Sequence, residues 1–142
     1  MKKLLLIIAL AVTAVYVTAR TLNAGPDRTM ATTPVSDAMN GEARKFSAAL
    51  LELAEQGKPR DFGSRCANLK DERLLTYYRC MEQVAKDGYS FTGVETLRKQ
   101  PDMVLVHLSN PRSGEFICTL KRSPKNHTYQ FISFLPEDGH ID

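Results

Sequence analysis

The chain has 142 residues, enough for one domain once an N-terminal leader is set aside, and its 43% hydrophobic and 25% charged content is that of an ordinary globular protein. Its formal net charge is +3, but Lys2 and Lys3 belong to the leader, and without them 17 basic residues face 16 acidic ones. A protein that binds nucleic acid needs a basic stripe, which this balance does not supply. We therefore exclude nucleic acid as a partner.

Residues 1–19 have the three-part pattern of a secretory signal peptide: two lysines, an apolar run and small or β-branched residues before Arg20. The alternative is an uncleaved membrane anchor, although the apolar run of residues 4–19 is shorter than the roughly 20 residues that span a bilayer. Cleavage predicts a periplasmic or secreted protein. Retention predicts a domain tethered to the inner membrane and facing away from the cytoplasm, and only then do we expect membrane contact.

Residues 20–35 are rich in Thr, Gly, Pro and Ala and predict a flexible linker. A domain over 36–142 follows, and it begins with a helix over 36–56 that Ser36 or Asn40 can cap and Gly57 can close. Its apolar stripe consists of Met39, Ala43, Phe46, Leu50 and Leu53.

A connection over 58–69, with room for a helical turn, leads to a second helix over 70–86 that ends at Gly88. Its predicted buried stripe is Leu74, Tyr77 or Tyr78, Met81, Val84 and Ala85. A strand over 89–96 follows, in which Gly93 marks a bulge or bend, and then a connection over 97–102.

Residues 103–135 carry the strongest β pattern: three apolar runs separated by turn clusters at 110–114 and 123–127. Two helices followed by four strands predict an α+β domain, with the helices packed on one face of a roughly four-stranded antiparallel sheet.

Burial decides the register of the first turn in this meander. A five-residue loop over 110–114 pairs Leu108 with Phe116 and Val106 with Cys118, which gathers apolar side chains on one face, whereas a slip of one residue would bring Thr119 and Lys121 there. If the second loop also has five residues, Ile132 and Phe134 join that face and the helices cover it.

The opposite face is then unusually apolar for a surface left in water, and apolar surfaces of this kind often bind partners. The predicted partner-binding residues are Met103, Leu105, Ile117, Tyr129 and Phe131. The alternative is that part of the chain, such as the linker or the first strand, covers this face.

Export to an oxidising compartment permits a disulfide among the three cysteines. We predict a Cys66–Cys80 bridge. Cys80–Cys118 and three free thiols remain as alternatives, because Cys66 can reach Cys80 only if the connection folds back along the second helix.

We find no pattern of catalytic, cofactor-binding or metal-binding residues. His107, His127 and His140 lack ligand spacing, and glycine loops for phosphate and serine-nucleophile motifs are absent. Arg60, Arg65, Lys70 and Arg73 are interspersed with acids, which predicts a solvated, internally neutralised surface.

The resulting hypothesis is a small exported envelope protein without enzymatic activity, a binding, inhibitory or assembly module whose partner is another envelope protein. Two alternatives remain: a membrane-tethered accessory subunit of an envelope complex, and a small periplasmic hydrolase or thiol enzyme using Cys66 or Cys118 with a histidine.

Overall fold

The computed structural model describes residues 31–67 and 70–137. The predicted leader over 1–19 and most of the linker over 20–35 lie outside the described residues. The chain divides into two compact units, Thr33–Phe134 and the chain ends Met1–Thr32 with Leu135–Asp142. Most of the second unit lies outside the described residues, and the first contains almost all of the structure that follows.

The described residues form an α+β fold, as predicted, but with five strands in the sheet instead of four. The strand order is β2-β3-β4-β5-β6, so sheet neighbours follow the order of the chain. In chain order the elements are β2 (Thr32–Pro34), α2 (Asp37–Glu55), α3 (Pro59–Gly63), α4 (Asp71–Asp87), β3 (Ser90–Leu97), β4 (Gln100–Asn110), β5 (Gly114–Arg122) and β6 (Tyr129–Pro136).

The additional strand, β2, lies in the segment that composition predicted to be a linker. It has three residues, and the Thr96 hydroxyl of β3 donates to the Thr33 carbonyl at 3.5 Å. So short a strand has no apolar alternation that a sequence pattern could reveal, because its conformation depends on the neighbouring strand.

The helix ends follow the sequence closely. The Ser36 hydroxyl caps α2 by accepting from the Met39 amide at 3.2 Å. Gly57 and Gly88 adopt φ values of +72° and +96°, which glycine tolerates better than other residues, and they follow α2 and α4 as predicted. The predicted helical turn in the connection is α3.

The buried stripe of α2 is rotated relative to the predicted one, whereas that of α4 agrees with it at its centre. In α2, Met39, Phe46 and Leu53 are only partly buried. The buried side chains are Ala43, Ser47, Leu50, Leu51 and Ala54 in α2, and Tyr77, Met81 and Val84 in α4.

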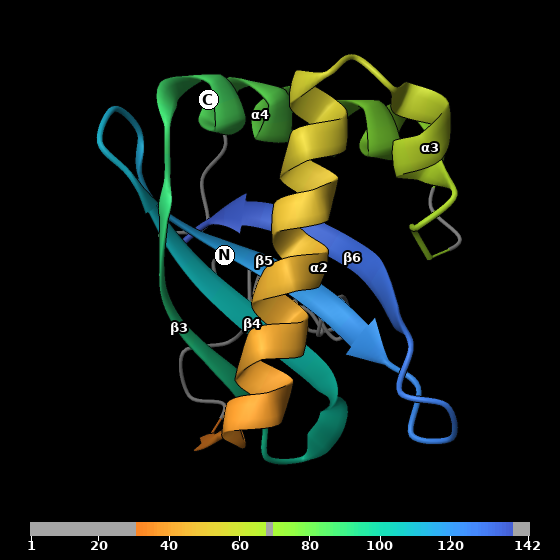
Figure 1. Ribbon diagram of the computed structural model, residues 1–142, viewed down its shortest axis with the longest axis vertical. Coiled ribbons are helices and arrows are strands. Elements are labelled where there is room, and N and C mark those ends of the chain that lie inside the picture. The colour runs from red at the N-terminus through yellow and green to blue at the C-terminus, as the bar shows by residue number, and fades with distance from the viewer. Residues whose placement is uncertain (1–30, 68–69, 138–142) are drawn as a thin grey trace, which may run out of the picture. The chain divides into compact units, whose positions relative to one another are not determined.

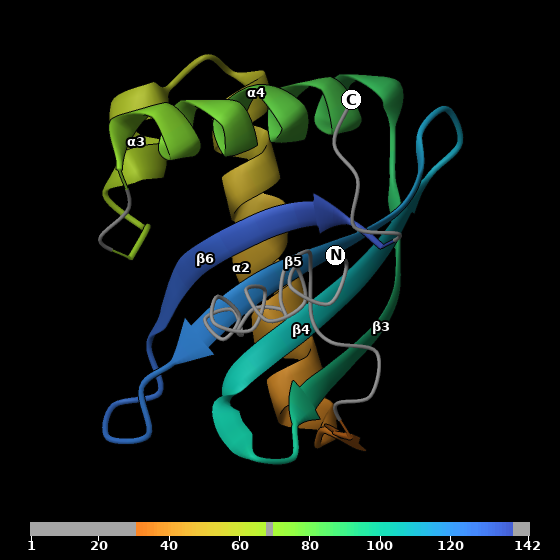
Figure 2. The same cartoon turned by 180° about the vertical axis from the view of Figure 1, so that it is seen from behind.

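The helices lie on one side of the central strands. Figure 1 shows α2 crossing in front of β4 and β5, and Figure 2 shows the same strands in front of α2. Helix α4 packs against α2 and crosses it near the C-terminal end of α2 (Figure 1). One face of the sheet is therefore occupied by helices.

The β4–β5 hairpin has the predicted register. Ser109 pairs with Glu115 across the five-residue loop, and Val106 pairs with Cys118. The Cys118 sulfur lies 3.7 Å from the Ser47 hydroxyl of α2, so its face of the sheet is the one that α2 covers. We call it the helix face; on β4 and β5 it consists of Val104, Val106, Leu108, Phe116, Cys118 and Leu120.

The second turn differs from the five-residue loop considered above. The Ser123 amide donates to the Thr128 carbonyl at 2.8 Å, so these residues pair across four residues. A change of one residue turns the following strand over. Accordingly, Tyr129 lies on the side of α2, where its ring centroid is 5.7 Å from that of Phe46.

Phe131 also lies on the helix face, where it is fully buried. Its ring centroid lies 5.6 Å from that of Phe62 and 5.7 Å from that of Tyr77. Phe134 stacks on Phe116 of the helix face, with ring centroids 4.9 Å apart. Residues three apart lie on opposite faces of a regularly alternating strand, yet Phe131 and Phe134 are both fully buried.

The connection predicted over 97–102 is a tight turn instead. Leu97 of β3 already pairs with Gln100 of β4, which leaves only Arg98 and Lys99 between them. Pro101, which suggested a break, is accommodated at a shift in the β3–β4 register. A second shift lies between Phe91 and Gly93, where the bulge was predicted.

Candidate functional site

The sheet face opposite the helix face carries an apolar centre. Leu97, Leu105 and Ile117 pack together there, and Met103 lies against them. We call this surface the outer face; it consists of that centre and a polar margin of Glu95, His107, Thr119 and Lys121, placed on the same side by the strand register.

The centre of the outer face is shielded from water. Leu97, Leu105 and Ile117 keep exposed fractions of only 6%, 3% and 6%, whereas Met103 is partly exposed. The prediction that this face is apolar is confirmed for these strands, but its centre is a second buried layer and not an open patch. Met103 packs against this layer and is itself partly exposed.

The margin of the outer face is polar, and apart from Thr119, which is 8% exposed, it is more exposed than the centre. The His107 Nε2 atom lies 2.7 Å from a Glu95 carboxylate oxygen, and both side chains are partly exposed. Lys121 pairs with Met103 across β4 and β5 and is exposed. The outer face thus combines an apolar side chain with charged groups, an arrangement typical of the border of a protein–protein interface.

The structure brings together only part of the predicted partner-binding set. Met103, Leu105 and Ile117 lie on the outer face, while Tyr129 and Phe131 lie on the helix face because of the shorter second turn. This placement corrects the prediction for the last two residues.

Leu97 and Glu95 belong to the outer face but were not predicted there. Leu97 was assigned to a connection, and only the two-residue turn at 98–99 brings it beside Leu105. That turn alone would place Glu95 opposite Asp102. Its observed position, opposite Leu105 and within reach of His107, depends also on the register shift between Thr96 and Leu97, which no local pattern reports.

All three cysteines are free thiols, so the predicted Cys66–Cys80 disulfide is not formed in the structure. The Cys66 thiol instead donates to the Phe62 carbonyl at 3.3 Å. The backbone beside Cys66 is held to β6, since the Phe131 amide donates to the Arg65 carbonyl and the Ala67 amide to the Phe131 carbonyl, both at 2.8 Å. This pairing keeps the connection along β6 instead of folding it back along α4.

Burial makes these thiols weak nucleophiles. Desolvation raises the pKa of Cys66 to about 11 and that of Cys118, which is fully buried, to about 12, although the Ser47 hydroxyl partly opposes the second shift. Desolvation also raises the pKa of Cys80. A reactive cysteine needs the opposite shift, because the thiolate is the attacking species.

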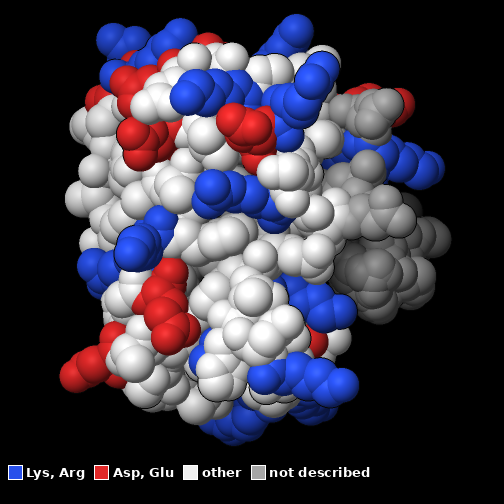
Figure 3. Space-filling model, turned by 45° about the vertical axis from the view of Figure 1, so that its right-hand side comes forward, with Lys and Arg blue, Asp and Glu red and all other residues white. Residues whose placement is uncertain are grey.

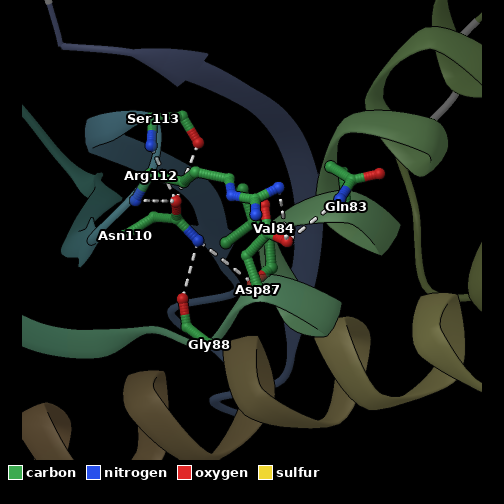
Figure 4. Close-up of polar contacts among 7 residues, drawn as sticks. All are labelled: Gln83, Val84, Asp87, Gly88, Asn110, Arg112 and Ser113. Atoms are coloured by element: carbon green, nitrogen blue, oxygen red, sulfur yellow. Dashed lines mark hydrogen bonds and ion pairs between the residues drawn. The ribbon is translucent and has the colours of Figure 1, made fainter.

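Asn110 uses its side chain to join the end of α4 to the β4–β5 turn (Figure 4). Its amide nitrogen donates to the carbonyls of Gly88 at 2.7 Å and Val84 at 3.3 Å. Its oxygen accepts from the Arg112 and Ser113 amides and from the Ser113 hydroxyl, each at 2.8 Å. Asn110 is 2% exposed and fully occupied, so its role is structural. The sequence indicated only that it belongs to a turn.

Charged side chains of both signs are interspersed on the face that Figure 3 shows. Among residues 31–67 and 70–137, no group of His, Cys, Asp and Glu is arranged to hold a metal ion. Within the same residues, no helix combines the length and apolar character needed to cross a bilayer. His140, considered above as a ligand, lies outside the described residues.

No family model, curated protein or solved structure matches this chain. The outer face, the state of the thiols and the sequence of the leader are therefore the features that bear on function.

Proposed function

We propose that the chain is a small exported binding module of the cell envelope, without enzymatic activity, and that it binds another envelope protein through the outer face. The observation that carries this proposal is the partly exposed Met103, which continues the apolar layer of Leu105 and Ile117 to the surface. The leader supplies the argument for export.

The chemistry of the outer face supports a protein partner. A methionine side chain is flexible and polarizable and adapts to the shape of an apposed surface. The Glu95–His107 pair and Lys121 lie around the apolar layer and offer both signs of charge to a partner. Such groups contribute mainly to specificity and to the rate of association.

The thiol-enzyme alternative is disfavoured by the surroundings of the cysteines. At neutral pH a thiol with a pKa of about 11, such as Cys66, is protonated in all but a minute fraction of molecules. Cys118 is fully buried against Ser47 and has no access to a substrate.

The test is partner capture from native envelope extracts with the unmodified chain, Met103→Glu and Leu75→Glu. Leu75 lies on α4 with an exposed fraction of 46%, so Leu75→Glu is a matched apolar-to-acidic control away from the outer face. We expect Met103→Glu to lose the protein that the unmodified chain and Leu75→Glu both retain, because a carboxylate would be desolvated against the partner.

Thermal melts of the three proteins establish that each is folded. Retention of the same protein by a folded Met103→Glu variant would contradict the proposal. The intact mass of the captured chain also distinguishes the exported module from the membrane-tethered alternative. A cleaved signal peptide predicts a chain that begins at Arg20, whereas a retained anchor predicts one that begins at Met1.

A further inference from the structure

We draw no further inference here: the strongest candidate, the apolar cluster of Leu97, Leu105 and Ile117 at the centre of the outer face, belongs to the site already described, and nothing among the described residues shows what covers it.

Discussion

Asn110 shows how one side chain can hold two elements of this fold together. The amide nitrogen donates to the Gly88 carbonyl just beyond α4 and to the Val84 carbonyl, which also accepts from the Gly88 amide at 3.0 Å. The oxygen organises the five-residue turn whose length sets the register of the β4–β5 hairpin. A buried amide with all of its hydrogen-bonding groups engaged is costly to remove, because its partners lose their bonds without gaining water.

We therefore expect Asn110→Ala to lower the free energy of unfolding by about 2–4 kcal/mol, measured by denaturant titration. Asn126→Ala is the matched control: its oxygen also accepts from a turn, at the Thr128 amide and hydroxyl, but it is exposed. Its loss should cost less than about 1 kcal/mol. Equal losses from the two variants would show that the link to α4 contributes nothing.

The raised pKa of Cys118 predicts how the free energy of unfolding depends on pH. Its ordinary pKa is 9.0, and burial raises it to about 12 in the folded chain. Below pH 9 both states keep the proton and stability is unaffected. Between pH 9 and 12 the unfolded chain loses its proton first, so the folded state becomes less stable as the pH rises.

By pH 10.5 the titration of Cys118 should lower the free energy of unfolding by about 2 kcal/mol. Other groups titrate in the same range, so the measured quantity is the difference in unfolding free energy between the unmodified chain and Cys118→Ala from pH 7 to 10.5. We expect this difference to shrink with rising pH. A constant difference would mean that Cys118 is not desolvated in the folded chain.

At the scale of elements, much of the fold could be predicted from local patterns. The cap of α2 and the glycines that follow α2 and α4 depend on one residue each, such as Ser36 and Gly88, so they were predicted correctly. The β4–β5 register was predictable because one pairing puts only apolar side chains on one face, and that pairing is observed.

The sequence was less informative where two arrangements bury similar side chains. In β6, Phe131 faces one side of a regular strand and Phe134 the other, so apolar burial does not choose between a four- and a five-residue turn. The structure buries Phe131 against Phe62 of α3 and Phe134 against Phe116 of β5. The strand β2 and the two-residue turn at 98–99 depend on pairing with distant residues, which no local pattern reports.

The placement of β6 can be tested by Phe131→Ala. Because Phe131 is fully buried against Phe62 and Tyr77, we expect a loss of about 3–5 kcal/mol in the free energy of unfolding. Tyr129→Phe keeps the ring and removes a hydroxyl that donates to Glu42 in an exposed hydrogen bond of 3.0 Å, and it should cost less than about 1 kcal/mol. Near-native stability of Phe131→Ala would favour the outer-face position that the sequence predicted.

At the scale of the whole molecule, the sheet has unlike faces. The helix face is closed by α2 and by rings from α3 and α4, which makes it the main core of the unit Thr33–Phe134. The outer face has an apolar centre but none of the three described helices over it (Figure 2). This asymmetry leads us to assign folding stability to the helix face and partner binding to the outer face.

Methionine oxidation tests this assignment most directly, because the three methionines of the described residues lie in three different settings. Met103 is on the outer face, Met39 is a partly buried residue of α2, and Met81 is fully buried in α4. The rate of sulfoxide formation at each is measured by mass spectrometry with and without the captured partner. We predict that the partner slows the oxidation of Met103 several-fold and leaves the oxidation rates of Met39 and Met81 unchanged. If the partner slowed the oxidation of Met39 and not that of Met103, the outer face would not be the binding surface.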